Sequence, residues 1–163
     1  MIVVRPAELR GLDAAALEAL LARRECVVVI GEGELRGLAA AACLFADYCA
    51  LIEGATLCID CGEAWAGVVW RLRRRALSVA GFVAAEQARE QGLVDEVIVA
   101  AEPWLETWLR HRSTAALDTA AALLGANGGD ALERAAFARL FAAGEPQKGL
   151  AAFLAKRPPA FGE

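Results

Sequence analysis

The stretch "VVVIGEGELRGLAAAACLFADYC" (27–49) does most to decide the fold of this chain. It opens on a continuous β-branched run that "GEGE" stops, a pattern typical of a strand buried on both faces. Gly37 and Leu38 follow, and behind them stand five small residues, 39–43. We expect a helix over 38–46, and its small side chains suit either close packing in a buried helix or a backbone that approaches a ligand.

Helices and buried strands alternate on both sides of this stretch. Such alternation indicates α/β layering. Apolar residues at helical spacing, cap residues and short β-branched runs mark the elements. We expect a helix over 13–25 that Asp13 caps, strands at 26–30 and 56–60, and a helix late in 65–81. The stretch 84–99 predicts a helix, a Gly92 C-cap and a strand. The remainder predicts helices, with breaks at 125–130 and 144–146.

Length and composition indicate one globular domain. The chain has 163 residues, of which 58% are hydrophobic and 23% charged, enough apolar surface for a packed core. The net charge of -4 gives no general attraction to nucleic acid or to an anionic membrane. The local arginine run at 71–75 suits a solvated face or a phosphate contact. With no signal peptide and no apolar run long enough to span a bilayer, we expect a cytoplasmic protein.

The cysteines and the single histidine give little support for metal or redox chemistry. Five cysteines in apolar surroundings favour buried, reduced thiols. "CIDC" (58–61) has the spacing of redox and zinc sites, but no second such pair or histidine pair accompanies it. His111 lies between two arginines, where a surface position is the favoured interpretation. We therefore expect no bound metal.

Three stretches in the same order resemble conserved segments of the crotonase superfamily, the enoyl-CoA hydratases and isomerases. The stretch 27–57 is similar to a segment A-A-V-N-G-x-A-x-G-G-G-x-E-L-A-L-A-C-D-x-x-I-A-x-x-x-A-x-F. "GFVAAEQAREQGLVDEVI" (81–98) is similar to T-G-x-x-I-x-A-x-E-A-x-x-x-G-L-V-x-x-V. The tail 137–161 is similar to a closing pattern of an acidic turn, A-F-L-E-K-R and P-x-F. No one stretch is decisive, and the resemblance rests on their order and separation.

The resemblance implies a crotonase-like (ClpP/crotonase) α/β fold of ββα units, here N-terminally reduced. It places the α/β core at 1–105 and a helical C-terminal region of the same domain at 106–163. It further implies a homotrimer or hexamer that takes an acyl-CoA or acyl carrier protein thioester as substrate and needs no separate cofactor. In that family two backbone N–H groups hold the thioester oxygen.

Carried onto this chain, the resemblance assigns individual residues. Leu38 falls on a glycine whose backbone N–H is one of the two oxyanion donors, and its side chain is expected to crowd the pocket. Ala41 falls on a catalytic glutamate, so that carboxylate is absent. Glu63, and next Asp60, are the candidates for the second catalytic acid, although both also suit solvated loop positions. The loop that carries the first oxyanion donor is not found.

The tail assigns two residues to CoA binding. Phe137 falls where the family places an aromatic ring against adenine, and Lys156 where it places a lysine near the phosphates. A ring face and a cation suit a purine and a phosphate. The competing interpretation is a core phenylalanine and a solvated lysine.

Three functions follow from these assignments. The first is an enzyme that stabilises a thioester enolate, for hydratase, isomerase or lyase chemistry, with the loss at Ala41 favouring reactions other than simple hydration. The second is a catalytically silent crotonase-like subunit that acts in binding or assembly. The third is an α/β domain whose likeness to the family is only ancestral, with no cleft at Leu38.

Overall fold

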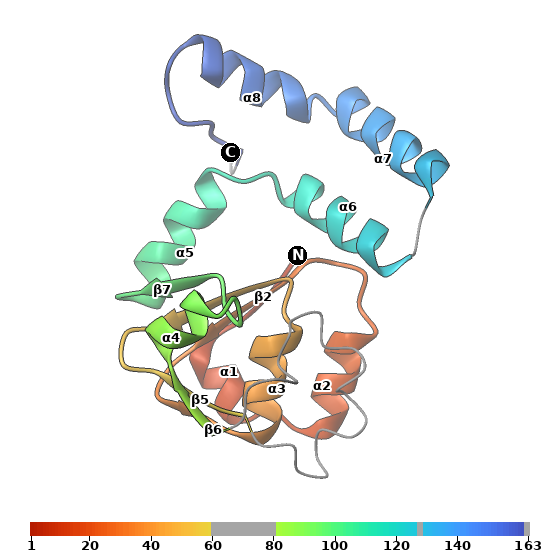
Figure 1. Ribbon diagram of the computed structural model, residues 1–163. Coiled ribbons are helices and arrows are strands. Elements are labelled where there is room, and N and C mark those ends of the chain that lie inside the picture. The colour runs from red at the N-terminus through yellow and green to blue at the C-terminus, as the bar shows by residue number, and fades with distance from the viewer. Residues whose placement is uncertain (60–80, 127–128, 162–163) are drawn as a thin grey trace. The chain divides into compact units, whose positions relative to one another are not determined.

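Figure 1 shows a computed structural model of the chain, which describes residues 1–59, 81–126 and 129–161. These residues form two compact units. The α/β unit contains Ile2–Arg23 and Val27–Ala101, and the helical unit contains Met1, Arg24–Cys26 and Glu102–Glu163. The helix expected late in 65–81 and the arginine run 71–75 lie outside the described residues.

The larger sheet of the α/β unit is entirely parallel. Its strands lie in the order β1 (Ile2–Val4), β2 (Val27–Gly31), β4 (Tyr48–Ile52) and β7 (Glu96–Ile98). All five residues of β2 are buried, because neighbouring strands and packed helices leave a central parallel strand no wet face. The predicted strand buried on both faces is confirmed.

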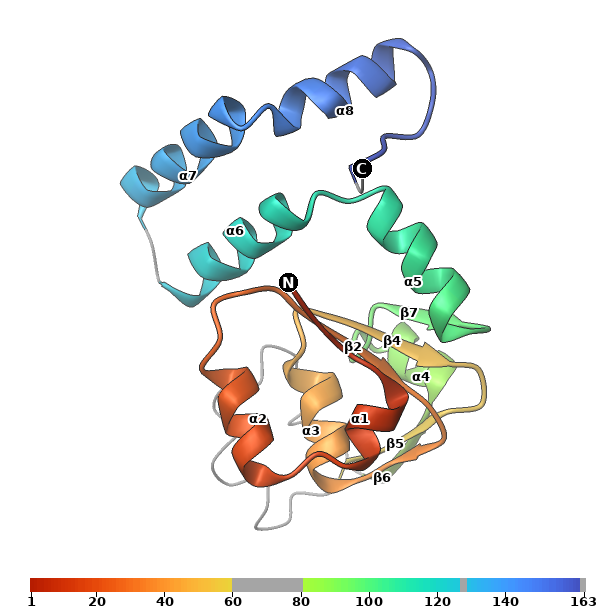
Figure 2. The same ribbon diagram turned by 180° about the vertical axis from the view of Figure 1, so that it is seen from behind.

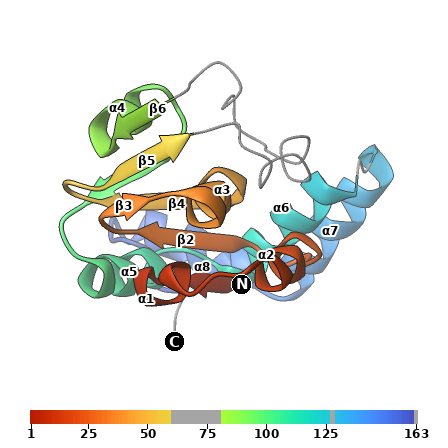
Figure 3. The ribbon, with the colours of Figure 1, turned by 90° about the horizontal axis from the view of Figure 1, so that it is seen from below.

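In the described part of the α/β unit, the smaller sheet has three strands in the order β3 (Glu34–Leu35), β5 (Thr56–Ile59) and β6 (Gly81–Ala84). β3 and β5 run parallel, and β5 and β6 antiparallel. Leu35, Leu57 and Val83 form one row across the sheet, and all three are buried in the hydrophobic core. In Figure 3, β5 and β6 of the smaller sheet lie above β2 of the larger sheet.

Two neighbouring strands of the larger sheet, β2 and β4, are each held near their start by hydrogen bonds to an aspartate. The Asp47 carboxylate accepts from the Val27 N–H at 2.9 Å, and the Asp47 N–H donates to the Val27 carbonyl at 2.9 Å. Asp95 repeats the arrangement with Cys49, at 2.7 and 2.8 Å. These pairs of hydrogen bonds fix where β2 and β4 begin. They also satisfy backbone groups at the end of the sheet where these strands start.

The described residues of the α/β unit also form the helices α1 (Pro6–Arg10), α2 (Ala14–Leu21), α3 (Gly37–Phe45) and α4 (Ala85–Glu90). α3 packs against β2 of one sheet, β5 of the other, and α1 and α2 (Figure 2). A helix enclosed on several sides needs small side chains, since helix axes approach only as closely as those side chains allow. Packing is thus a sufficient explanation for the small residues 39–43.

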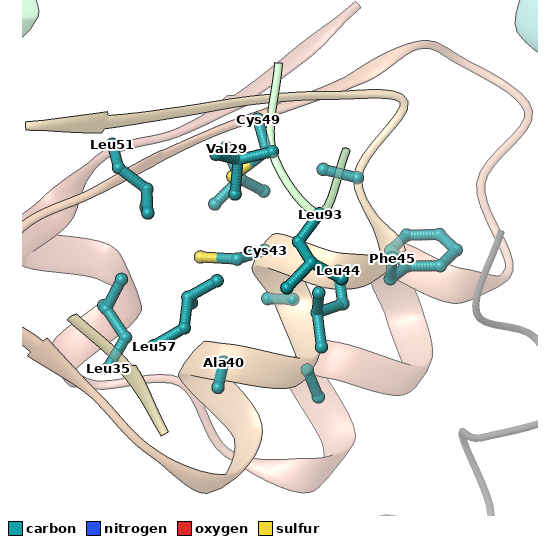
Figure 4. Packing of buried hydrophobic residues seen from close by; sticks show 14 of the residues in the cluster. Val29, Leu35, Ala40, Cys43, Leu44, Phe45, Cys49, Leu51, Leu57 and Leu93 are labelled. Atoms are coloured by element: carbon teal, nitrogen blue, oxygen red, sulfur yellow. The ribbon is translucent and has the colours of Figure 1, made fainter. Parts of the chain in front are cut away.

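The core of this unit gathers side chains from both sheets around α3. Figure 4 shows Cys43 among Leu51 of β4 and Leu57 of β5. Each of these three side chains is 0% exposed. The close packing explains the many short apolar side chains of α3, because dense interiors leave no room for larger ones.

The helical unit contains α5 (Ala101–Arg110, whose first residue belongs to the other unit), α6 (Thr114–Gly125), α7 (Asp130–Ala142) and α8 (Glu145–Leu154). Within it, the Asp118 carboxylate accepts from the Cys26 N–H and from the Met1 amino group, each at 2.8 Å. None of the helices in the described ranges is both long and apolar enough to span a membrane.

Most of the expected elements are confirmed, within a few residues at their ends. Asp13 caps α2 by accepting from the Ala16 N–H at 2.7 Å, and Gly92 follows α4 with a φ of 71°. The breaks near 125–130 and 144–146 separate α6, α7 and α8. The strands β1, β3, β4 and β6 and the short helix α1 were not predicted.

Candidate functional site

The start of α3 presents backbone N–H groups that the helix itself does not use. Gly37 adopts a φ of 51°, a conformation that glycine adopts without strain. The Ala39 and Ala40 N–H groups donate to the Arg36 carbonyl at 3.1 and 3.5 Å. Gly37 and Leu38 precede them, in the turn whose N–H groups have no acceptor within a helix. With the helix dipole, this turn favours an anionic oxygen.

The Leu38 side chain lies partly buried and packs against the hydrophobic core. A leucine held in this way keeps its backbone N–H in the first turn of α3. The side chain thus contributes to core packing. Whether it also crowds a substrate pocket stays a prediction.

Ala41 lies in the middle of α3, where the resemblance assigns a catalytic glutamate. It is 1% exposed and belongs to the hydrophobic core, as do Ala40 and Ala42 on either side. An ionised carboxylate in such surroundings is unfavourable unless it is paired. The chain therefore has neither the carboxylate nor a polar environment for it at this position.

The two candidates for the second catalytic acid, Asp60 and Glu63, lie outside the described residues. The segment that holds them connects β5, which ends at Ile59, to β6, which begins at Gly81. Their role as acids stays a prediction.

Phe137 lies on the surface of α7 and is 62% exposed. Its ring contacts that of Phe141, with centroids 4.5 Å apart. The interpretation of Phe137 as a core residue is therefore wrong, because most of its side chain faces outward. An exposed ring is free to stack on a planar ligand.

Lys156 is exposed and follows the end of α8. The Lys156 N–H donates to the Phe153 carbonyl at 3.0 Å and the Arg157 N–H to the Ala152 carbonyl at 3.1 Å. These two bonds form a Schellman motif, which requires a left-handed residue at Lys156. Lys156 has a φ of 51° and is the only non-glycine residue with positive φ in the described part of the chain. Leu38 belongs to the other unit, so a joint site with Lys156 or Phe137 stays a prediction.

We expect Lys156→Gly to stabilise the chain. Glycine adopts the left-handed conformation without the steric cost that a Cβ adds, a gain of about 0.5–1 kcal/mol after its larger unfolded-state entropy is subtracted. Thermal unfolding should show a Tm about 1–4 °C higher. Lys156→Ala, which removes the ammonium group but keeps the Cβ, is the control and should not raise the Tm. Equal Tm values for the two variants would contradict the strain argument.

The corner between α5 and α6 contains residues that the sequence did not single out as structural. The His111 Nδ1 lies 2.7 Å from the Pro159 carbonyl oxygen, so this nitrogen carries the proton, since a carbonyl only accepts. The Phe161 N–H donates to the Arg110 carbonyl at 2.9 Å. His111 is half-buried and holds the C-terminal segment, so it has a structural role that its position between two arginines did not indicate.

Ser113 and Glu145 connect this corner to the start of α8. Ser113 is buried, and its hydroxyl accepts from the Ala116 N–H at 3.0 Å as the N-cap of α6. It also hydrogen-bonds the Glu145 carboxylate, which lies 3.3 Å from the Lys148 ammonium. The Ser113 hydrogen bond, with a smaller contribution from Lys148, holds the pKa of Glu145 below its usual value, against the opposing effect of burial.

This lowered pKa predicts that Glu145 stabilises the helical unit only above acid pH. A carboxyl whose pKa is lower in the folded state contributes stability above its unfolded pKa, and loses it as pH falls through the folded value. Glu145→Gln should therefore lower the Tm at pH 7 and leave it unchanged at a pH below the folded pKa. A Tm difference that persists undiminished in acid would contradict this origin.

The described cysteines are all free thiols. Cys26, Cys43, Cys49 and Cys58 are buried, which confirms the prediction of reduced, buried thiols for these four. Cys61 of the "CIDC" motif lies outside the described residues. Within residues 1–59, 81–126 and 129–161, no group of three or more histidine, cysteine or acidic side chains is arranged to hold a metal ion.

Comparison with known proteins finds similarity in structure only. No sequence-family model matches the chain, and no curated protein matches it by sequence. An enoyl-CoA hydratase from Mycobacterium smegmatis is similar over 96% of this chain and 68% of its own, with 18% identity and a TM-score of 0.60. An enoyl-CoA hydratase/isomerase family protein from Hyphomonas neptunium covers 91% of this chain and 65% of its own, at 22% identity and a TM-score of 0.66.

A third structure agrees with these two. It is an enoyl-CoA hydratase from Polaromonas sp. JS666, which matches 94% of this chain and 67% of its own, with 22% identity and a TM-score of 0.63. The chain thus spans about two thirds of the length of the structures that it matches. At this identity the likeness concerns the fold: the chain has the crotonase fold of the enoyl-CoA hydratase and isomerase structures, as the resemblance in its sequence implied.

Proposed function

We propose that the chain binds an acyl-CoA or acyl-phosphopantetheine thioester and stabilises its enolate by hydrogen-bonding the thioester oxygen from the Leu38 N–H. The observation that carries the proposal is the start of α3. There a left-handed Gly37 precedes Leu38, while the next two N–H groups already have the Arg36 carbonyl as acceptor. The crotonase fold of the chain supports the same assignment.

The chemistry of an enolate suits such a donor. When a base removes the α-proton of a thioester, or when a carboxylate on that carbon is lost as CO2 and leaves its electron pair behind, negative charge develops on the thioester oxygen. A backbone N–H at a helix N-terminus is fixed before the reaction, so it stabilises this charge without reorganisation. We propose Glu63, and next Asp60, as the group that moves the proton. A second acid at Ala41 is absent, which favours isomerisation, decarboxylation or another enolate reaction over hydration.

Binding of the nucleotide part of CoA is assigned to the helical unit. Phe137 offers an exposed ring for adenine, and Lys156 an exposed ammonium group for a phosphate. Lys156→Gly removes the charge while favouring the fold, so weaker CoA binding by this variant would not reflect unfolding. A phosphopantetheine substrate on a carrier protein would depend less on both residues.

The first experiment is a thermal-shift titration with acetyl-CoA and crotonyl-CoA, followed by an absorbance assay for the enoyl thioester. We expect both ligands to raise the Tm. Turnover of crotonyl-CoA that Glu63→Gln abolishes would support an enzyme with Glu63 as its acid. Binding without turnover of any enolisable thioester is the result expected of a silent subunit. Absence of binding by both CoA and carrier-protein thioesters would refute the proposal.

The second experiment removes the proposed donor itself. Leu38→Pro deletes the backbone N–H in the first turn of α3, where proline costs a helix no internal hydrogen bond. Gly37 has no Cβ to clash with the ring of the proline. Leu38→Ala removes the same packing but keeps the N–H and is the matched control. We expect turnover to fall about 10²-fold or more in Leu38→Pro relative to Leu38→Ala, as for loss of one oxyanion donor.

We also propose that the chain assembles as a homotrimer or hexamer. Large apolar side chains are exposed along the last three helices, and contiguous exposed apolar surface is characteristic of interaction sites. They include Leu124, Leu132, Phe141, Leu150, Phe153 and Leu154. Light scattering coupled to size-exclusion chromatography should give three or six times the monomer mass. The double variant Phe153→Glu and Leu154→Glu should give a lower mass. A monomer at micromolar concentration would refute this assembly.

A further inference from the structure

We infer that Arg36 is a positioning residue that fixes the first turn of α3, and with it the Leu38 N–H, to the outer face of the smaller sheet. The inference rests on the proposed function, because it concerns the same donor. Arg36 is the N-cap residue of α3, yet its side chain makes no capping hydrogen bond. Arginine is an unusual residue for a helix N-cap, so another role for this side chain is expected.

The Arg36 side chain reaches across all three strands of the smaller sheet. Its Nε forms an ion pair with Glu34 of β3. One guanidinium nitrogen lies 3.8 Å from the Cys58 Sγ of β5, and the guanidinium carbon lies 4.8 Å from the ring centroid of Phe82 of β6. A planar guanidinium suits this combination of a carboxylate on its edge and an aromatic ring beneath its face.

The strand register explains why these residues meet. Leu35 pairs with Leu57, and one residue further along β5 Cys58 pairs with Phe82. Arg36 directly follows Leu35 and is therefore level with Cys58. Successive residues of a strand point to opposite faces, so the row of Leu35 and Leu57 enters the core and the row of Arg36 faces away from it.

The same residue holds the helix through its backbone. The Arg36 carbonyl accepts from both Ala39 and Ala40, so the first turn of α3 is anchored to the residue whose side chain is anchored to the sheet. Gly37 lies between Arg36 and Leu38 with a left-handed conformation, and without a fixed Arg36 it gives the turn freedom to rotate. Geometry of an oxyanion donor matters over fractions of an ångström.

The test compares Arg36→Met with wild type in the binding of cinnamoyl-CoA, a conjugated thioester whose absorbance shifts to longer wavelength when its carbonyl oxygen accepts strong hydrogen bonds. We expect wild type to bind and shift the spectrum. Arg36→Met keeps an apolar stem of similar length, and should bind with little change in affinity but lose most of the shift. Arg36→Lys, which keeps the charge but not the planar group, should not restore it.

Two further variants complete the design. Phe82→Leu removes the ring face from a half-exposed side chain, and should reduce the shift even if Arg36→Met does not fold. Arg89→Met removes an exposed arginine that pairs with Glu86 on α4, and should leave the shift intact. An undiminished shift in Arg36→Met and Phe82→Leu would overturn the inference and leave the proposed function standing. Absence of binding by wild type would overturn both.

Discussion

Ala41→Glu is expected to destabilise the chain severely instead of restoring a catalytic acid. Ala41 is 1% exposed and enclosed in the hydrophobic core. The longer side chain overpacks this core, and its carboxylate is buried without a designed partner. Together these effects should cost about 4 kcal/mol or more, a large part of the stability of an ordinary domain. Chemical denaturation should show a strongly reduced midpoint, or no folded protein at neutral pH.

Two control variants separate the contributions to this loss of stability. One separates the size of the new side chain from its charge, and the other separates the buried position from the glutamate itself. Ala41→Gln has almost the same volume, so its smaller loss of stability measures the cost of size and amide burial alone. Ala39→Glu introduces the same carboxylate at a partly exposed position of α3 and should be much milder. Burial raises the pKa of the introduced Glu at position 41, so its defect relative to Gln should shrink as pH falls. A stable Ala41→Glu with new hydratase activity would show that the position faces an active site.

The elements that the sequence predicted are those specified by local patterns. The β-branched run of β2, the Asp13 cap and the Gly92 cap each depend on a few adjacent residues. β4 was missed because Tyr48–Ile52 follows α3 after only Ala46 and Asp47, with no glycine or proline between them. Its identity as a strand depends on pairing with β2 and β7, which no local pattern encodes.

The site was predicted less fully than the fold, because its features depend on contacts between distant residues. Leu38 was assigned through the resemblance to the crotonase superfamily, and its role as a donor stays a prediction. The burial of Ala41 could not be predicted, since it depends on α1, α2 and two sheets enclosing one helix. Likewise Ser113 and Glu145 are far apart in sequence and meet only when α8 returns to the corner before α6. The role of Arg36 could not be predicted from the sequence. Its neighbours Cys58 and Phe82 come together only through the register between β5 and β6.

Gly31→Ala is the second substitution with a large expected effect. Gly31 is the last residue of β2, and a Cβ there would lie 2.5 Å from Leu35 Cδ1 and 2.7 Å from Leu51 Cδ2. Both leucines are buried, at 4% and 0% exposure, so neither can move away freely. The resulting strain should cost about 2–3 kcal/mol, measured as a lower free energy of unfolding in urea.

The control for this glycine is Gly11→Ala in the same unit. A Cβ at Gly11 would lie 3.9 Å from the Glu8 carbonyl oxygen, an ordinary contact, so its effect should stay within about 0.5 kcal/mol. Leu51→Val combined with Gly31→Ala should recover part of the loss, because contacting residues are energetically coupled. A Gly31→Ala variant with normal stability but weaker thioester binding would instead mean that this glycine is required for a ligand's approach. The urea measurement therefore decides why position 31 is a glycine. A loss of stability in Gly31→Ala indicates the close packing of β2 on its neighbours, and normal stability with weaker binding indicates a bound thioester.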